Sequence, residues 1–154
     1  MFPHQAMKLP ARLISGMLAL TLAILAGCTG KTEDISIINA WIAEAPPTSK
    51  VMVGYLTLVN NTSRDLTIVK ARSQSFSSIE FHETIHEDGM ARMVRHESLP
   101  IPAGEELILT RGGRHLMLFN PVSAFRAGDR ISITLVRQDG IEITIQPEVR
   151  KAEF

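Results

Sequence analysis

The amino-acid sequence predicts an all-β domain, arranged as an antiparallel β-sandwich. From Ile35 onward, short runs of β-type residues alternate with turn residues. Residues 131–136 and 141–145 alternate apolar with polar side chains around an Asp139-Gly140 turn, the pattern of a hairpin with one buried face. Beyond the apolar N-terminal segment, no stretch has the 3.6-residue period of an amphipathic helix. Eight or nine short strands separated by frequent turns are typical of a β-sandwich.

Turn residues set the boundaries of the expected strands. Pro46-Pro47 separates the first two strands, and 60–63 forms a polar turn after the second. A Glu87-Asp88-Gly89 turn joins the fourth and fifth strands into a hairpin. Residues 111–114 form the turn before the strand that starts at His115. The strands expected from this pattern are 35–42, 51–59, 66–71, 79–85, 92–97, 107–110, 115–119, 131–136 and 141–145.

The N-terminal segment has the layout of an export signal. Lys8 and Arg12 precede an apolar run over 13–26 that is short for a membrane-spanning helix. The following Leu25-Ala26-Gly27-Cys28 resembles the bacterial lipobox, in which the cysteine is lipidated and becomes the new N-terminus. The alternative is an ordinary signal peptide or short anchor with an incidental cysteine.

This reading divides the chain into four parts. We expect a signal peptide over 1–27, a lipidated tether over 28–34, the β-sandwich domain over 35–148 and a polar tail over 149–154. The protein would then lie on the periplasmic side of a membrane, and Thr29 in place of an aspartate after the lipidated Cys28 favours the outer membrane.

Charge and cysteine content exclude several classes of function. The signal segment holds two basic and no acidic residues, so the remaining chain has 14 basic and 16 acidic residues and no basic face for nucleic acid. Cys28 is the only cysteine, so the domain has no thiolate for a blue-copper electron-transfer centre. No serine or cysteine stands in a recognisable nucleophile motif, so we do not expect an enzyme.

Methionines and histidines concentrate between residues 82 and 117. His115 and Met117 are two apart in an expected strand, so both side chains project from one face, with bases roughly 6.5–7 Å apart. His82 and Met93 lie on the two arms of the expected hairpin, centred within a residue of its turn, and should face each other across the strands. Each pair is brought together by local structure, one by a strand and the other by a hairpin. A single tertiary contact between the pairs would therefore complete a four-ligand pocket.

The types of donor indicate which metal would bind. Thioethers are soft and neutral and imidazole is borderline, so two of each favour Cu(I). Zinc would prefer thiolates, histidines or carboxylates, and calcium or magnesium would prefer oxygen. A neutral ligand set holds Cu(I) less tightly than thiolates would, which suits a protein that must release its metal.

The spacing His82-x10-Met93-x21-His115-x-Met117 resembles the signature of the PCu(A)C-type periplasmic copper chaperones. The similarity covers the whole domain. It includes Ala45-Pro46-Pro47, Tyr55-Leu56-Thr57-Leu58, His82-Glu83-Thr84, Pro102-Ala103-Gly104, Gly113-Arg114-His115-Leu116-Met117 and Ala127-Gly128-Asp129.

The resemblance implies a cupredoxin-like, Greek-key β-sandwich that binds one Cu(I) ion at an exposed site. The ligands it implies are His82, Met93, His115 and Met117. Family members deliver copper to respiratory cytochrome oxidase, especially its CuA centre, often together with thiol-based Sco-type proteins. This chain lacks the Met- and His-rich C-terminal extension of many members, which puts a second copper site, including one for Cu(II), in doubt.

Several alternatives remain open from the sequence. Met90 is either a flanking hydrophobic residue or an auxiliary ligand, and His86 and His96 are either exposed or second-layer groups near the site. Met52 is expected in the core and Trp41 in the core or at its rim. The protein could instead buffer copper or confer resistance without a client, or it could be a metal-free interaction module.

Overall fold

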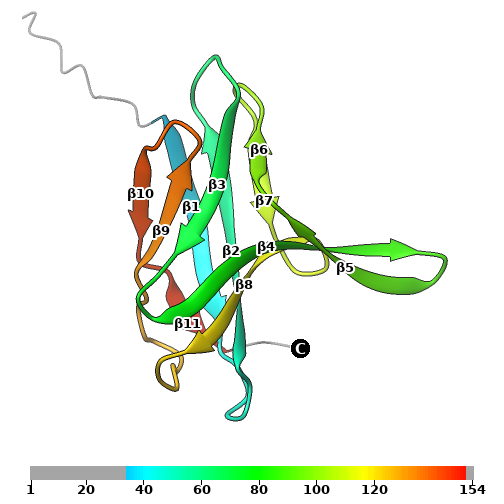
Figure 1. Cartoon of the computed structure of the whole chain (residues 1–154), viewed down its shortest axis with the longest axis vertical. Coiled ribbons are helices and arrows are strands. Elements are labelled where there is room, and N and C mark those ends of the chain that lie inside the picture. Colours follow the sequence, from blue (N-terminus) through cyan, green and yellow to red (C-terminus); the bar gives the residue numbers. More distant parts are fainter. Residues whose placement is uncertain (1–33, 152–154) are drawn as a thin grey trace, which may run out of the picture. The chain divides into compact units, whose positions relative to one another are not determined.

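Strands make up the regular structure of residues 34–151, the part of the chain that this computed structural model describes (Figure 1). The predicted signal peptide, Cys28, the tether up to residue 33 and the last three residues lie outside it. No helix within the described range could cross a membrane. The strands are β1 Ile35–Ala43, β2 Val51–Asn60, β3 Leu66–Arg72, β4 Phe76–Glu87, β5 Met90–His96, β6 Leu99–Ile101, β7 Glu106–Leu109, β8 Arg114–Pro121, β9 Ile133–Arg137, β10 Glu142–Ile145 and β11 Glu148–Arg150.

All of these strands belong to one hydrogen-bonded sheet that folds over on itself. The main path runs β10-β9-β3-β4-β8-β2-β1-β11, while β5, β6 and β7 pair with β4, β3 and β2 respectively. Every pairing is antiparallel except the parallel pairing of β1 with β11. The predicted antiparallel, all-β sandwich is therefore confirmed, with one parallel pair added.

Two strands lie where the sequence predicted none, β6 and β11. Strand β11 falls across the predicted boundary at residue 148, because Val149 pairs with Ile42 and both side chains are fully buried. The polar tail therefore cannot begin at residue 149. At the other end, Asp34 was assigned to the tether, yet its carboxylate accepts a hydrogen bond of 2.9 Å from Arg137 Nη1 and so is tied to the domain.

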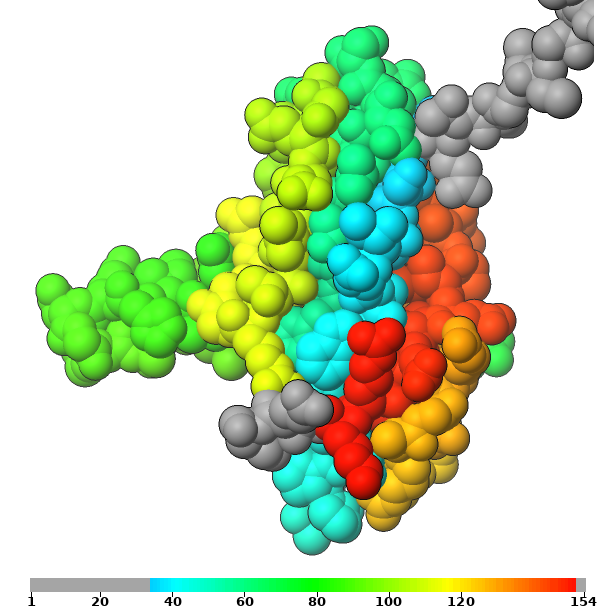
Figure 2. Space-filling view, turned by 180° about the vertical axis from the view of Figure 1, so that it is seen from behind, coloured from blue at the N-terminus to red at the C-terminus, as the bar shows by residue number. Residues whose placement is uncertain are grey.

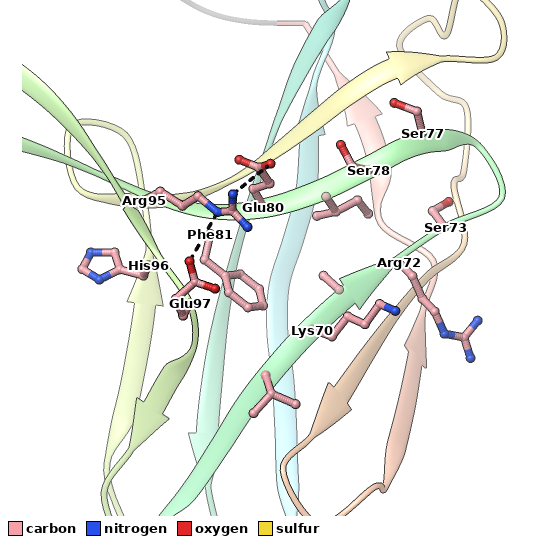
Figure 3. Close-up of a pocket in the computed structure, with 13 residues that line it drawn as sticks. Lys70, Arg72, Ser73, Ser77, Ser78, Glu80, Phe81, Arg95, His96 and Glu97 are labelled. Carbon is pink, nitrogen blue, oxygen red and sulfur yellow. Dashed lines mark ion pairs between the residues drawn. The ribbon is translucent and has the colours of Figure 1, made fainter.

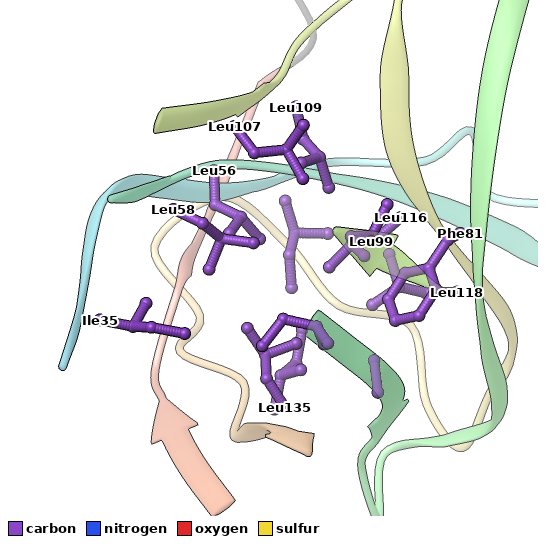
Figure 4. Close-up of a cluster of buried hydrophobic side chains, with 14 of the residues drawn as sticks. Ile35, Leu56, Leu58, Phe81, Leu99, Leu107, Leu109, Leu116, Leu118 and Leu135 are labelled. Carbon is purple, nitrogen blue, oxygen red and sulfur yellow. The ribbon is translucent and has the colours of Figure 1, made fainter. Parts of the chain in front are cut away.

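The core lies between the facing layers and is filled by alternate residues of the strands (Figure 4). Strand β8 shows the pattern, because Leu116 and Leu118 are buried in the core while Met117 between them points to the other face. Met52 of β2 is buried, as the sequence predicted. The site-bearing face of β8 is thus held in place by packing on its opposite face.

Strand β4 has two halves with different surroundings. Its first half pairs with β8 as far as the Glu83–Arg114 register, and the second half pairs only with β5. The β4–β5 hairpin projects from the body of the domain as a two-stranded arm (Figures 1 and 2). Its turn is Asp88-Gly89, where both residues have positive φ, 51° and 75°, as a two-residue type I′ turn requires.

Candidate metal centre

Strands β4 and β8 bring the two predicted histidine ligands together. His82 lies directly opposite His115 in the antiparallel register, and Met117 follows two residues later on the same face of β8. The two imidazole rings are inclined by 28° with their centroids 6.2 Å apart. Metal–imidazole bonds are about 2 Å long and lie in the plane of the ring, so rings at this separation can share an ion when their free nitrogens turn toward it.

The His82 ring has one nitrogen engaged and one free. Nε2 lies 2.9 Å from Oε2 of Glu80, a carboxylate that accepts a hydrogen bond from the ring N–H. Nδ1 then carries a lone pair, and it is buried without any hydrogen-bond partner. Native structures rarely leave a buried polar atom unpaired, so an orphaned nitrogen on a side chain that shares its face with soft donors fits a metal ligand.

The His115 ring is oriented by the backbone. Its Nδ1 lies 3.0 Å from the carbonyl oxygen of Gly113, which also accepts a 3.1 Å hydrogen bond from the amide of Thr84 at the base of the arm. The side chain is only 5% exposed. With Nδ1 donating to the carbonyl, Nε2 is the nitrogen left for a metal.

Met93 lies on the same face as His82 but not directly opposite it. Arg95 is the register partner of His82, whereas Met93 is opposite Thr84, two residues nearer the turn. The predicted face-to-face pairing of His82 with Met93 is therefore wrong by two residues, because the two-residue turn centres the hairpin between Asp88 and Gly89. Met93 is a diagonal neighbour of His82, still within reach of a long side chain, and is 52% exposed.

The remaining methionine and histidine candidates lie on different faces of the β4–β5 hairpin. Met90 is opposite Glu87, on the face of the arm away from Met93, and is 71% exposed. His96 faces away from His82 as well, and its Nε2 lies 2.7 Å from a carboxylate oxygen of Glu83. His86 is exposed and shares the face of Met93. The register thus opposes Met90 as an auxiliary ligand and leaves His86 as a candidate.

Glu80 is a site residue that the sequence analysis missed. The other oxygen of its carboxylate lies 3.7 Å from Nη1 of Arg95. Arg95 is the residue of β5 that pairs with His82, so the Glu80 carboxylate contacts both members of that pair. Figure 3 shows Arg95 joined to Glu80 and Glu97 beside a cavity of about 420 Å³ where β3 and β4 diverge. The signal was present, because residues two apart in a strand share a face.

Apolar and aromatic side chains surround the donors on this face. Phe119 lies 6.4 Å from His82 between ring centroids, and Val53 of β2 is the register partner of Met117. Trp41 packs on Tyr55 with centroids 4.7 Å apart, and the Arg111 guanidinium lies 5.4 Å from the Trp41 ring centroid. Burial raises the pKa of Tyr55 although the charge of Arg111 opposes it, so the phenol stays neutral at physiological pH.

The donor set fits a soft, monovalent ion. Across the described residues, two imidazole nitrogens of this set are free of protein hydrogen bonds, two thioethers lie on the same face, and no cysteine is present. Within residues 34–151, no three His, Cys, Asp or Glu side chains gather closely enough to hold a metal ion.

Comparison with known proteins identifies the family. The family described as "Putative lipoprotein LpqE-like" matches residues 35–149, almost the whole described domain. The chain belongs to this family. It is 34% identical over 113 residues to Lxx21020 of Leifsonia xyli, whose name also describes a lipoprotein; the match covers 72% of this chain and 67% of that protein. It is 29% identical to the uncharacterised RP573 of Rickettsia prowazekii, over 62% of this chain and 53% of that protein.

Solved structures give the same fold. The solution structure of Cu(I)-DR1885 from Deinococcus radiodurans is 32% identical, with a TM-score of 0.61 over 73% of this chain and 75% of that one. The copper-bound PCuAC domain of PmoF2 is 22% identical, with a TM-score of 0.65 over 77% of this chain and 94% of that one, which supports the fold. The predicted resemblance to the PCu(A)C-type family and its cupredoxin-like fold is therefore confirmed.

Proposed function

We propose that this LpqE-like protein is an extracytoplasmic metallochaperone that binds one Cu(I) ion through His82, Met93, His115 and Met117. The observation that carries the proposal is the pairing of His82 with His115, each with one ring nitrogen held by the protein and the other left free. Met117 and Met93 add soft sulfur donors on the same face. The copper-bound relatives in this fold class support the same cargo.

The same ligand set also favours release of the copper ion. All four donors are neutral, so the ion keeps its positive charge and is held less tightly than by thiolates. Met93 lies half exposed on the arm, where an incoming ligand from an acceptor can approach the ion. Transfer by stepwise ligand exchange leaves copper as Cu(I), with no electron moved. The protein acts as a carrier and not as an enzyme.

The client in this proposal is the CuA-type centre of a respiratory oxidase, with a thiol-based Sco-type protein as a further partner. Lipidation at Cys28 would hold the domain on the periplasmic side of a membrane, the outer membrane being favoured. The family description and the Leifsonia relative support the lipoprotein assignment. Deleting the gene is expected to impair oxidase assembly, with rescue by added copper. Copper sensitivity without an assembly defect would instead indicate a buffering or resistance protein.

Anaerobic titration with Cu(I) against a competing chelator tests the ligand set. The wild type is expected to bind one ion, and a Met93→Ala/Met117→Ala variant to bind at least about 100-fold more weakly. Met90→Ala is the matched control, because it removes an exposed thioether from the opposite face of the same arm. X-ray absorption then counts sulfur and nitrogen scatterers. Equal, weak binding by the wild type and the double variant would leave a metal-free interaction module.

A further inference from the structure

The arm carries a second histidine on the face of Met93. In the β4–β5 register, His82, Thr84 and His86 alternate along β4, with Thr84 opposite Met93. Met93 is therefore a diagonal neighbour of both histidines, one toward the body of the domain and one toward the tip. Cα separations on such diagonals are about 7–8 Å, and imidazole and thioether side chains are long enough to meet around one ion.

The donors on the arm are more exposed than the donors in the body of the domain. His115 is 5% exposed and the His82 side chain 14%, whereas Met93 is 52% exposed and His86 is exposed as well. The arm from Ile85 outward pairs only with itself and projects from the body (Figures 1 and 2). The outermost donors are thus accessible to an acceptor that could not reach the buried histidine pair.

His86 also differs from the other histidine near the arm. The Nε2 of His96 is engaged by Glu83, and Glu83 is further held by Arg114 at 3.3 Å. In the described part of the chain, His86 makes no hydrogen bond or ion pair, so its ring is free to turn toward Met93. A neutral imidazole beside a neutral thioether is a suitable two-ligand site for Cu(I), which is soft and tolerates low coordination.

We propose that His86 and Met93 form an outer, transient Cu(I) site through which the metal enters and leaves the four-ligand centre. The inference rests on the proposed copper-binding function. Met93 belongs to both sites, so it can keep its bond to copper while His115, Met117 and His82 are exchanged for His86. In total the copper bonds to His115, Met117 and His82 break and one bond to His86 forms, so the coordination number falls from four to two and copper remains Cu(I). A ligand of the acceptor then displaces His86 and Met93 at the surface.

Transfer kinetics separate this role from the equilibrium site. Protein loaded with one Cu(I) is mixed anaerobically with a range of bicinchoninate concentrations, and formation of the copper–chelator complex is followed by stopped-flow absorbance. His86→Ala should still bind one Cu(I) with wild-type affinity, because the inner four ligands are intact. The chelator-dependent transfer rate should fall about tenfold. Met90→Ala, which removes an exposed donor from the other face near the tip, should transfer at the wild-type rate.

A second measurement detects the outer site directly. In a His82→Ala/His115→Ala variant, X-ray absorption should still find nitrogen and sulfur bound to weakly held Cu(I), and adding His86→Ala should remove the nitrogen. Transfer by His86→Ala as fast as by the wild type, or equal slowing by Met90→Ala, would overturn the outer site. Failure of the wild type to bind Cu(I) at all would instead refute the proposed function.

Discussion

At the scale of single residues, the two histidines of the centre present different nitrogens. A carboxylate holds Nε2 of His82, and a backbone carbonyl holds Nδ1 of His115. The partners fix opposite tautomers, so the metal would meet Nδ1 of one ring and Nε2 of the other. The sequence supplies two histidines, but only the folded strands decide which atom of each is available.

The tautomers can be read by ¹⁵N NMR of the metal-free protein at neutral pH. We expect His82 to carry its proton on Nε2 and His115 on Nδ1. Silver(I), a diamagnetic substitute for Cu(I), should shift Nδ1 of His82 and Nε2 of His115. The same type of nitrogen responding in both rings would contradict the assignment.

Glu80 should tune copper affinity without touching the metal. Its charge makes the His82 ring a stronger donor and fixes the ring's orientation, as carboxylates commonly do for ligating histidines. Glu80→Gln keeps the shape but loses the charge, and we expect Cu(I) affinity to fall by about tenfold in a chelator competition. Glu97→Gln is the control, because Glu97 also pairs with Arg95 but does not contact His82. Equal losses in both variants would place the effect on Arg95 instead.

At the scale of secondary-structure elements, the arm positions Met93 through its turn. Asp88 and Gly89 both adopt positive φ, and a methyl group on Gly89 would meet no atom within 4 Å. The cost of a side chain there is therefore one of backbone conformation alone. The turn sets the register, and the register sets which face carries Met93.

Gly89→Ala should loosen the arm and leave the body of the domain intact. We expect a cost of about 1 kcal/mol, seen by NMR as faster amide hydrogen exchange in the outer half of β4 and in β5. Gly104→Ala is a matched control, because Gly104 also has a positive φ of 70° and open space but lies between β6 and β7. Faster exchange throughout the domain in Gly89→Ala would show that the arm supports the fold.

The elements also show where prediction from sequence succeeds and where it fails. Alternation and turn residues located the β4–β5 hairpin and the strand that carries His115 and Met117. They did not give the register of the arm, because a shift of two residues keeps every side chain on its face and leaves the pattern unchanged. Strand β11 was missed because three residues are too few to show a period, and its burial depends on a tertiary pairing with β1.

At the scale of the whole molecule, ion pairs hold the first residue of the domain against the body. Asp34 accepts a hydrogen bond from Arg137, a side chain that is only 2% exposed, and also lies 3.4 Å from Arg64. The hydrogen bond from Arg137 is the main cause that lowers the pKa of Asp34 below its usual 3.8, although partial burial opposes it. The last residue of the predicted tether, Asp34, thus makes ionic contacts with the domain.

The sign of the resulting pH dependence follows from the lowered pKa. A carboxyl whose pKa is depressed on folding stabilises the fold above its unfolded pKa, and loses that effect as pH falls through the folded value. Asp34→Asn should therefore lower the Tm at pH 7, and its difference from the wild type should shrink below about pH 4. Asp88→Asn, at the exposed turn of the arm, should show no such pH-dependent difference. A constant difference at all pH values would exclude ionisation of Asp34 as the cause.

Substitutions in the core and on the arm should have different effects on stability and on metal binding. Leu118→Ala removes a fully buried core side chain and should cost about 2–5 kcal/mol in urea unfolding. Met93→Ala, on the exposed arm, should change the free energy of unfolding by no more than about 0.5 kcal/mol and yet weaken Cu(I) binding. A large loss of stability in Met93→Ala would mean that the arm is part of the folding core.

The hydrophobic core takes no residue from the chain between Phe81 and Leu99. Mutations in this segment are consequently freed from the main constraint on a small β-protein, since they can accumulate without lowering the population of folded molecules. Related proteins with the same β-sandwich could in this way come to serve different acceptor proteins without a change in the core. Selection would act on the arm for recognition of a partner and on the body for stability, so the two parts can change in sequence at different rates.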